Sequence, residues 1–94
     1  ALPIWDAPEV RYYLGEAYLK SGASEDAMRE FQHAISFGGN APEYISGLGV
    51  ACALAGKASE ARAQIAALDE LARKRAIAPE LRQRIEDALR KKGS

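Results

Sequence analysis

The sequence predicts an all-α fold of five helices, and three observations support this prediction. Apolar residues recur along the chain at the three- and four-residue spacing of amphipathic helices. Glycines that can end a helix separate these segments. The chain also repeats itself at a spacing of 34 residues: Pro8-Glu9 returns as Pro42-Glu43, Leu14-Gly15 as Leu48-Gly49, and Gly22 as Gly56. Such a period is typical of stacked copies of one helical unit.

The first expected helix runs from about Pro8 to the glycine at position 22. Its apolar residues have a spacing that predicts a stripe facing the core: Val10, Tyr13, Leu14, Ala17 and Tyr18. Asp6 and Glu9 form a capping-box pattern, in which side chains accept hydrogen bonds from free backbone N–H groups. Trp5 is then placed to pack on Val10 as a hydrophobic staple.

Four more helices follow, and each has a start or stop signal. The second ends at Gly38-Gly39, and Asn40 and Pro42 predict the N-cap and first turn of the third. The third closes at Gly56, and the fifth begins after Ile77 with Pro79 in its first turn. Their apolar positions are Ala27, Phe31, Ala34 and Ile35 in the second helix, Ala61, Ile65, Leu68 and Leu71 in the fourth, and Leu81, Ile85 and Leu89 in the fifth.

The length predicts one small domain over residues 1–94. We expect a first unit at about 8–41, a second at about 42–75 and a capping helix at about 79–91. The formal net charge is zero, but it is unevenly distributed. Residues 1–50 hold seven acidic and three basic residues (−4), and residues 51–94 hold six acidic and ten basic residues (+4). This polarity is compatible with head-to-tail self-association.

No arrangement of residues predicts an enzyme, a cofactor site or a metal site. Cys52 and His33 are the only residues of their types, so no Cys- or His-rich metal site is expected. Gly38-Gly39-Asn40 lacks the Gly-Lys-Ser/Thr signature of a phosphate-binding loop. Catalytic residues and a small-molecule substrate are therefore not expected. No apolar run approaches the roughly 20 residues of a membrane-spanning helix. The compartment stays open.

The repeated residues resemble the tetratricopeptide repeat, a helix–turn–helix unit of 34 residues. The first unit matches the family pattern at Leu14, Gly15, Tyr18, Ala27, Phe31 and Ala34, and the second matches it more loosely at Leu48, Gly49, Cys52, Ala61, Ile65 and Leu68. Two departures are Arg11 and Ile45, which stand where the family often has Trp. The resemblance covers residues 8–75 as two units and implies a curved α-helical stack.

The resemblance implies a protein-binding scaffold whose concave face carries the contact residues. The matching positions in this chain are Glu9, Tyr12, Glu16, Leu19, Lys20, Glu43, Ser46, Val50, Ala53 and Leu54. The three glutamates predict an acidic groove that accepts a peptide bearing basic residues. A helix face that is simply solvated explains the same residues, and this alternative stays open.

Two further functions compete with peptide binding. The chain resembles repeat regions of bacterial multi-domain proteins, so it can serve as an oligomerisation or spacer segment. The basic C-terminal end suggests nucleic-acid binding through phosphate contacts. The last aromatic residue is Tyr44, however, so no aromatic side chain near the basic residues supports base stacking.

Overall fold

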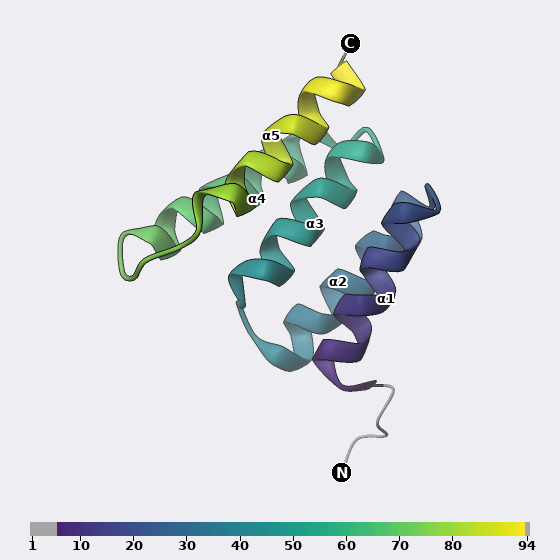
Figure 1. Ribbon diagram of the computed structural model, residues 1–94, viewed down its shortest axis with the longest axis horizontal. Coiled ribbons are helices and arrows are strands. Elements are labelled where there is room, and N and C mark those ends of the chain that lie inside the picture. The colour runs from purple at the N-terminus through teal and green to yellow at the C-terminus, as the bar shows by residue number, and fades with distance from the viewer. Residues whose placement is uncertain (1–5, 94) are drawn as a thin grey trace.

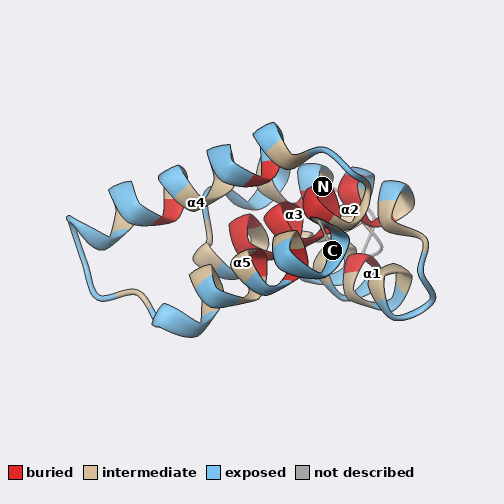
Figure 2. Ribbon diagram, turned by 90° about the horizontal axis from the view of Figure 1, so that it is seen from above, coloured by how far each residue is buried: buried red, intermediate tan, exposed pale blue. Residues whose placement is uncertain are grey.

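The five predicted helices are all present in the computed structural model, which describes residues 6–93 and contains no strand over that range. The helices are α1 (Pro8–Lys20), α2 (Ser24–Gly38), α3 (Pro42–Leu54), α4 (Ala58–Ala72) and α5 (Pro79–Gly93). Helices α1 and α2 form one antiparallel pair and α3 and α4 a second, and α5 packs beside α3 (Figure 1). Seen from above, α3 lies in the centre of the molecule (Figure 2). The all-α fold class is therefore confirmed.

The turns within the two helix pairs have the same geometry, as the repeat predicts. Gly22 and Gly56 both adopt the left-handed conformation, with φ of 83° and 82°. The residue after each glycine donates its backbone N–H to a carbonyl near the end of the preceding helix. Ala23 N–H bonds the Tyr18 carbonyl at 2.9 Å, and Lys57 N–H bonds the Cys52 carbonyl at 2.8 Å. These bonds satisfy carbonyl groups that the helix itself leaves without partners.

The predicted helix starts are correct in position but wrong in their caps. Ala7 and Ala41 occupy the N-cap positions of α1 and α3, and neither start has a side-chain cap. Asp6 instead pairs with Arg11, with 2.7 Å between Oδ1 and Nη2. Arg11 also reaches Glu30 at 2.9 Å and so ties α1 to α2, which explains why Asp6 is drawn away from the helix end. The predicted staple partner of Val10, Trp5, lies outside the described residues.

The first helix pair packs around the ring of Phe31, which is fully buried on α2. A β-carbon built on Gly15 of α1 would lie 2.8 Å from the Phe31 ring, and one built on Gly47 of α3 would lie 2.5 Å from it. Two helices therefore approach the same ring at positions where neither has a side chain. Gly15, which the sequence places inside a helix, is tolerated because α2 comes this close.

Four of the five residues of the apolar stripe predicted on α1 face outward, whereas the fifth, Tyr18, is half-buried and packs on the core. Val10, Tyr13 and Leu14 are 39%, 68% and 37% exposed, and Ala17 is also exposed. The residues of α1 that approach α2 lie on the other side of the helix, at Gly15 and Arg11. Hydrophobic spacing identified the helix correctly, but it did not identify which face meets the rest of the molecule.

Helix α5 packs mainly against α3 and makes a smaller contact with α4. The Ser46 hydroxyl of α3 donates a hydrogen bond to the Leu81 carbonyl at 2.7 Å. Ile85 is fully buried, and its side chain fills the space where a β-carbon of Gly49 would lie. Gly15 meets the second helix of its own pair at Phe31. Gly49 also meets the second helix of its pair, at Gln64 of α4, but its nearest neighbour is Ile85 of α5. The two glycines thus have different neighbours despite their equivalent sequence positions.

Replacing Gly47 with alanine tests the packing around Phe31. An unhindered Gly→Ala change inside a helix adds about 1 kcal/mol of stability. At Gly47 the new β-carbon would lie 2.5 Å from the buried ring, so we expect the free energy of unfolding to fall by about 1–3 kcal/mol. Urea denaturation measures the change. Adding Phe31→Leu should recover part of the loss, and a simple gain in stability in Gly47→Ala would contradict this packing.

Candidate functional site

The surface predicted to bind a partner is partly covered by α5. Three of its residues, Ser46, Val50 and Ala53, lie on one face of α3 because their spacing follows the helical repeat. They are 0%, 8% and 1% exposed, and the hydrogen bond from Ser46 to Leu81 places α5 over this face. The expectation that these three residues line an open groove is therefore wrong. A sequence template cannot show that the fifth helix fills this position.

The N-terminal halves of α1 and α3 form an open, acidic region. It includes three of the predicted residues. Tyr12 is half-buried, and Glu9 and Glu43 are exposed. The Tyr12 ring lies 5.4 Å from the ring of Tyr13 and 5.3 Å from the ring of Tyr44, measured between centroids. We call these five residues, Glu9, Tyr12, Tyr13, Glu43 and Tyr44, the acidic aromatic patch.

The electrostatics of this patch show that its carboxylates and tyrosines share one environment. Burial raises the pKa of the Tyr44 hydroxyl, and the negative charges of Glu9 and Glu43 raise it further. Burial also raises the pKa of the Tyr12 hydroxyl, followed by the charge of Glu16. Both tyrosine hydroxyls therefore remain protonated at neutral pH, and both lie near carboxylates. Such a site is suited to a cation, which carboxylates and aromatic rings both attract.

An ion pair between α1 and α5 bounds the acidic aromatic patch. Arg84 Nη2 of α5 lies 3.4 Å from both carboxylate oxygens of Glu16. Both side chains are partly exposed, at 38% for Arg84 and 25% for Glu16. The pair crosses the surface between residues that are 68 positions apart in the chain. An arginine of the chain itself therefore already contacts Glu16, one of the predicted acidic residues.

Beyond this ion pair, the last turns of α1, α3 and α5 surround a second open region. It is a hollow of about 500 Å³, which lies within the size range of ligand pockets. Its floor includes Leu19 and Leu54, both half-buried, and its rim carries three exposed lysines. We call it the lysine hollow and define it by Leu19, Lys20, Gly22, Ser24, Leu54, Lys91 and Lys92. Three of the predicted residues, Leu19, Lys20 and Leu54, lie here.

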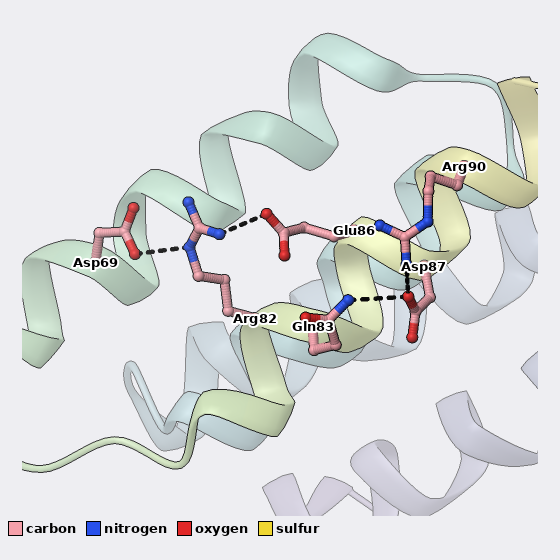
Figure 3. Close-up of polar contacts among 6 residues, drawn as sticks. All are labelled: Asp69, Arg82, Gln83, Glu86, Asp87 and Arg90. Carbon is pink, nitrogen blue, oxygen red and sulfur yellow. Dashed lines mark hydrogen bonds and ion pairs between the residues drawn. The ribbon is translucent and has the colours of Figure 1, made fainter.

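Helix α5 is held against α4 by a polar contact on the opposite side of the helix from these two regions. Arg82 donates to Asp69 of α4 at 3.0 Å and also pairs with Glu86 one turn along α5 (Figure 3). Within α5, Asp87 accepts hydrogen bonds from Gln83 and Arg90 (Figure 3). Arg82 therefore helps to fix the position of the helix that covers α3.

Several residues of this surface were missed by the sequence analysis. Tyr13 and Tyr44 are each adjacent to a predicted position, and their aromatic type was the available signal. Arg84, Lys91 and Lys92 come from α5, which the sequence assigned to capping. Only the folded position of α5 brings these basic residues to the predicted surface.

The described residues form neither a metal-binding cluster nor a membrane-spanning helix. Among residues 6–93, no group of three or more His, Cys, Asp or Glu side chains is arranged to hold a metal ion. None of the helices described combines the length and the apolar character needed to cross a bilayer. Cys52 is buried on α3 with its thiol free. Burial raises the pKa of this thiol to about 11, so it is protonated at neutral pH and does not act as a nucleophile.

Comparisons with protein-family models, with curated proteins and with solved structures found no match for this chain.

The reactivity of the Cys52 thiol tests whether this residue of α3 is buried as described. Because its pKa rises from 9.0 to about 11, the reactive thiolate is roughly a hundredfold scarcer near pH 8 than in the unfolded chain. We expect iodoacetamide to alkylate the native protein at least that much more slowly than protein in concentrated urea. Equal rates in the two states, measured by mass spectrometry, would show that Cys52 is not buried.

Proposed function

We propose that this domain binds a protein segment and receives an arginine or lysine of that segment in the acidic aromatic patch. The observation that supports this proposal most directly is the convergence of Glu9 and Glu43 with three tyrosines at the ends of two helices. Tyrosine side chains are enriched among binding hot spots. The implied activity is recognition of a partner and not catalysis.

The chemistry of the patch favours a basic side chain over other groups. Glu9 and Glu43 supply negative charge, while the rings of Tyr12 and Tyr13 are placed edge to face, with an interplanar angle of 62°. A guanidinium or ammonium group gains from carboxylates and from the negative face of an aromatic ring at the same time. An anionic or purely apolar group would gain from only part of this arrangement.

Arg84 of α5 supports the proposal from within the chain. Its guanidinium already contacts Glu16 and lies close enough to Tyr12 to lower the pKa of that hydroxyl, although burial and Glu16 raise it more. Glu16, which lies next to the patch, therefore already forms an ion pair with an arginine. A basic residue of a partner would compete with Arg84 for Glu16.

Binding of a fluorescein-labelled peptide of alternating Arg and Leu tests the proposal by fluorescence anisotropy. Glu9→Gln with Glu43→Gln should weaken binding about tenfold, because each exposed charge contact contributes up to about 1 kcal/mol. Arg84→Gln should strengthen it about two- to fivefold by freeing Glu16. Glu25→Gln with Glu60→Gln, which removes the same charge elsewhere, is the matched control.

Two results of this experiment would count against the acidic aromatic patch. One is equal binding of the Arg-Leu peptide and a Gln-Leu peptide, since the second offers no cation. The other is equal weakening by the control variant, which would indicate a general charge effect. Circular dichroism of each variant confirms that the helices remain folded.

A second candidate function, service as an oligomerisation segment, is favoured by the exposed face of α1. Large exposed apolar side chains of the described residues all belong to the first helix pair: Val10, Tyr13, Leu14 and Phe37. The equivalent face of α3, displaced by 34 residues, includes Leu48 and Ala51 and is buried. On α3 this face packs against neighbouring helices. On α1 the equivalent face is exposed, so a second molecule of the chain could pack against it.

Leu14→Lys tests the second candidate. If copies associate through the outer face of α1, the sedimentation coefficient of the native protein should rise with concentration, and the variant should remain monomeric. Ala63→Lys on α4 adds the same charge at another exposed position and should change nothing. Association that added salt reverses would assign it to the oppositely charged halves of the chain instead.

Nucleic-acid binding is not proposed, because many of the basic side chains at the C-terminal end already have acidic partners. Arg73 pairs with Glu70, Arg82 with Asp69 and Glu86, and Arg84 with Glu16. These ion pairs reduce the positive charge that phosphate groups would meet.

A further inference from the structure

The lysine hollow has a chemistry opposite to that of the acidic aromatic patch. Lys20 comes from α1, whereas Lys91 and Lys92 come from α5. Positively charged residues about 70 positions apart in the chain therefore line the same hollow. None of these three lysines forms an ion pair with any other described part of the chain. The hollow therefore gathers three lysines that form no ion pair within the described residues.

Stabilisation of helix ends explains only part of this arrangement. Lysines in the last turns of α1 and α5 are favourable because the C-terminal end of a helix carries partial negative charge. That effect acts on each helix separately and needs no common location. Here the lysines of two helices line one hollow together with Leu19 and Leu54, and Ser24 adds a hydroxyl group.

The floor of the hollow restricts the kind of anion that fits. Leu19 and Leu54 are half-buried, so part of each side chain remains available for apolar contact. A free inorganic anion would leave this surface unused. Nucleic acid would bring phosphate groups, but no aromatic side chain lines the hollow to stack with a base. A protein segment can supply carboxylates and an apolar side chain together.

We propose that the lysine hollow binds an acidic protein segment, with an apolar side chain packed on Leu19 and Leu54 and flanking Asp or Glu carboxylates paired with Lys20, Lys91 and Lys92. This inference rests on the proposed function, because it assigns the second end of the same binding surface. The partner then has a fixed direction: its basic residue lies at the first turns of α1 and α3, and its acidic residues lie at their last turns.

A fluorescein-labelled peptide of alternating Glu and Leu tests the assignment by anisotropy with the full chain. Lys20→Glu with Lys91→Glu should weaken binding about tenfold or more, since two attractive contacts become repulsive. Lys20→Arg with Lys91→Arg keeps the charge and should bind within about twofold of the native protein. Lys74→Glu with Arg75→Glu changes the net charge equally outside the hollow and should have a much smaller effect.

Comparison with other ligands separates the role of the lysines from that of the apolar side chains. Binding of a Gln-Leu peptide as tight as that of the Glu-Leu peptide would overturn the role of the lysines. If a single-stranded oligonucleotide binds as tightly as the Glu-Leu peptide, the proposed role of an apolar side chain packed on Leu19 and Leu54 is overturned. If the Glu-Leu peptide fails to bind while the Arg-Leu peptide still binds through Glu9 and Glu43, the lysine hollow is excluded and the proposed function remains. If only the Glu-Leu peptide binds, the acidic aromatic patch is excluded instead.

Discussion

The arrangement of the helices depends on the contact between Phe31 and two glycines. Phe31 projects from α2, and Gly15 of α1 and Gly47 of α3 present bare backbone to the same ring. This contact brings the first helix of each pair close to α2 and so sets α1 and α3 near each other. The tyrosines and glutamates of the acidic aromatic patch lie within the first two turns of these two helices. Their proximity therefore follows from a packing contact that contains no functional group.

Local signals predicted the helices well because their causes are local. Prolines in the first turns of α1 and α3, and glycines in the left-handed conformation after α1 and α3, act within a few residues of their own positions. The caps were wrong because Ala7 and Ala41 hold the N-cap positions, and Asp6 pairs with Arg11 instead. The face of α1 was wrong because apolar spacing does not distinguish a core from an uncovered surface. Residue spacing describes a helix, whereas neighbouring helices decide its orientation.

The candidate site shows the same division between local and distant causes. The predicted positions on α1, such as Tyr12 and Glu16, are partly exposed. The corresponding positions on α3 are buried, because α5 packs on α3 more extensively than on α4. Small residues on α3, including Gly49 and Ala53, permit this close approach. Small and apolar residues occupy all sides of α3, which is typical of a buried helix, but this pattern does not identify α5 as the element that covers it.

The central position of α3 has a consequence for how the domain comes apart. Nine consecutive residues, from Ile45 to Ala53, are buried on this helix, so its whole circumference is shielded from water. Long repeat arrays can lose terminal units one at a time, because each unit depends only on its neighbours. In this domain, detaching either flank would expose α3 to solvent along much of its length. Thermal melting should therefore proceed as one cooperative transition, and a protease cut between the helix pairs would leave two fragments that cannot fold separately.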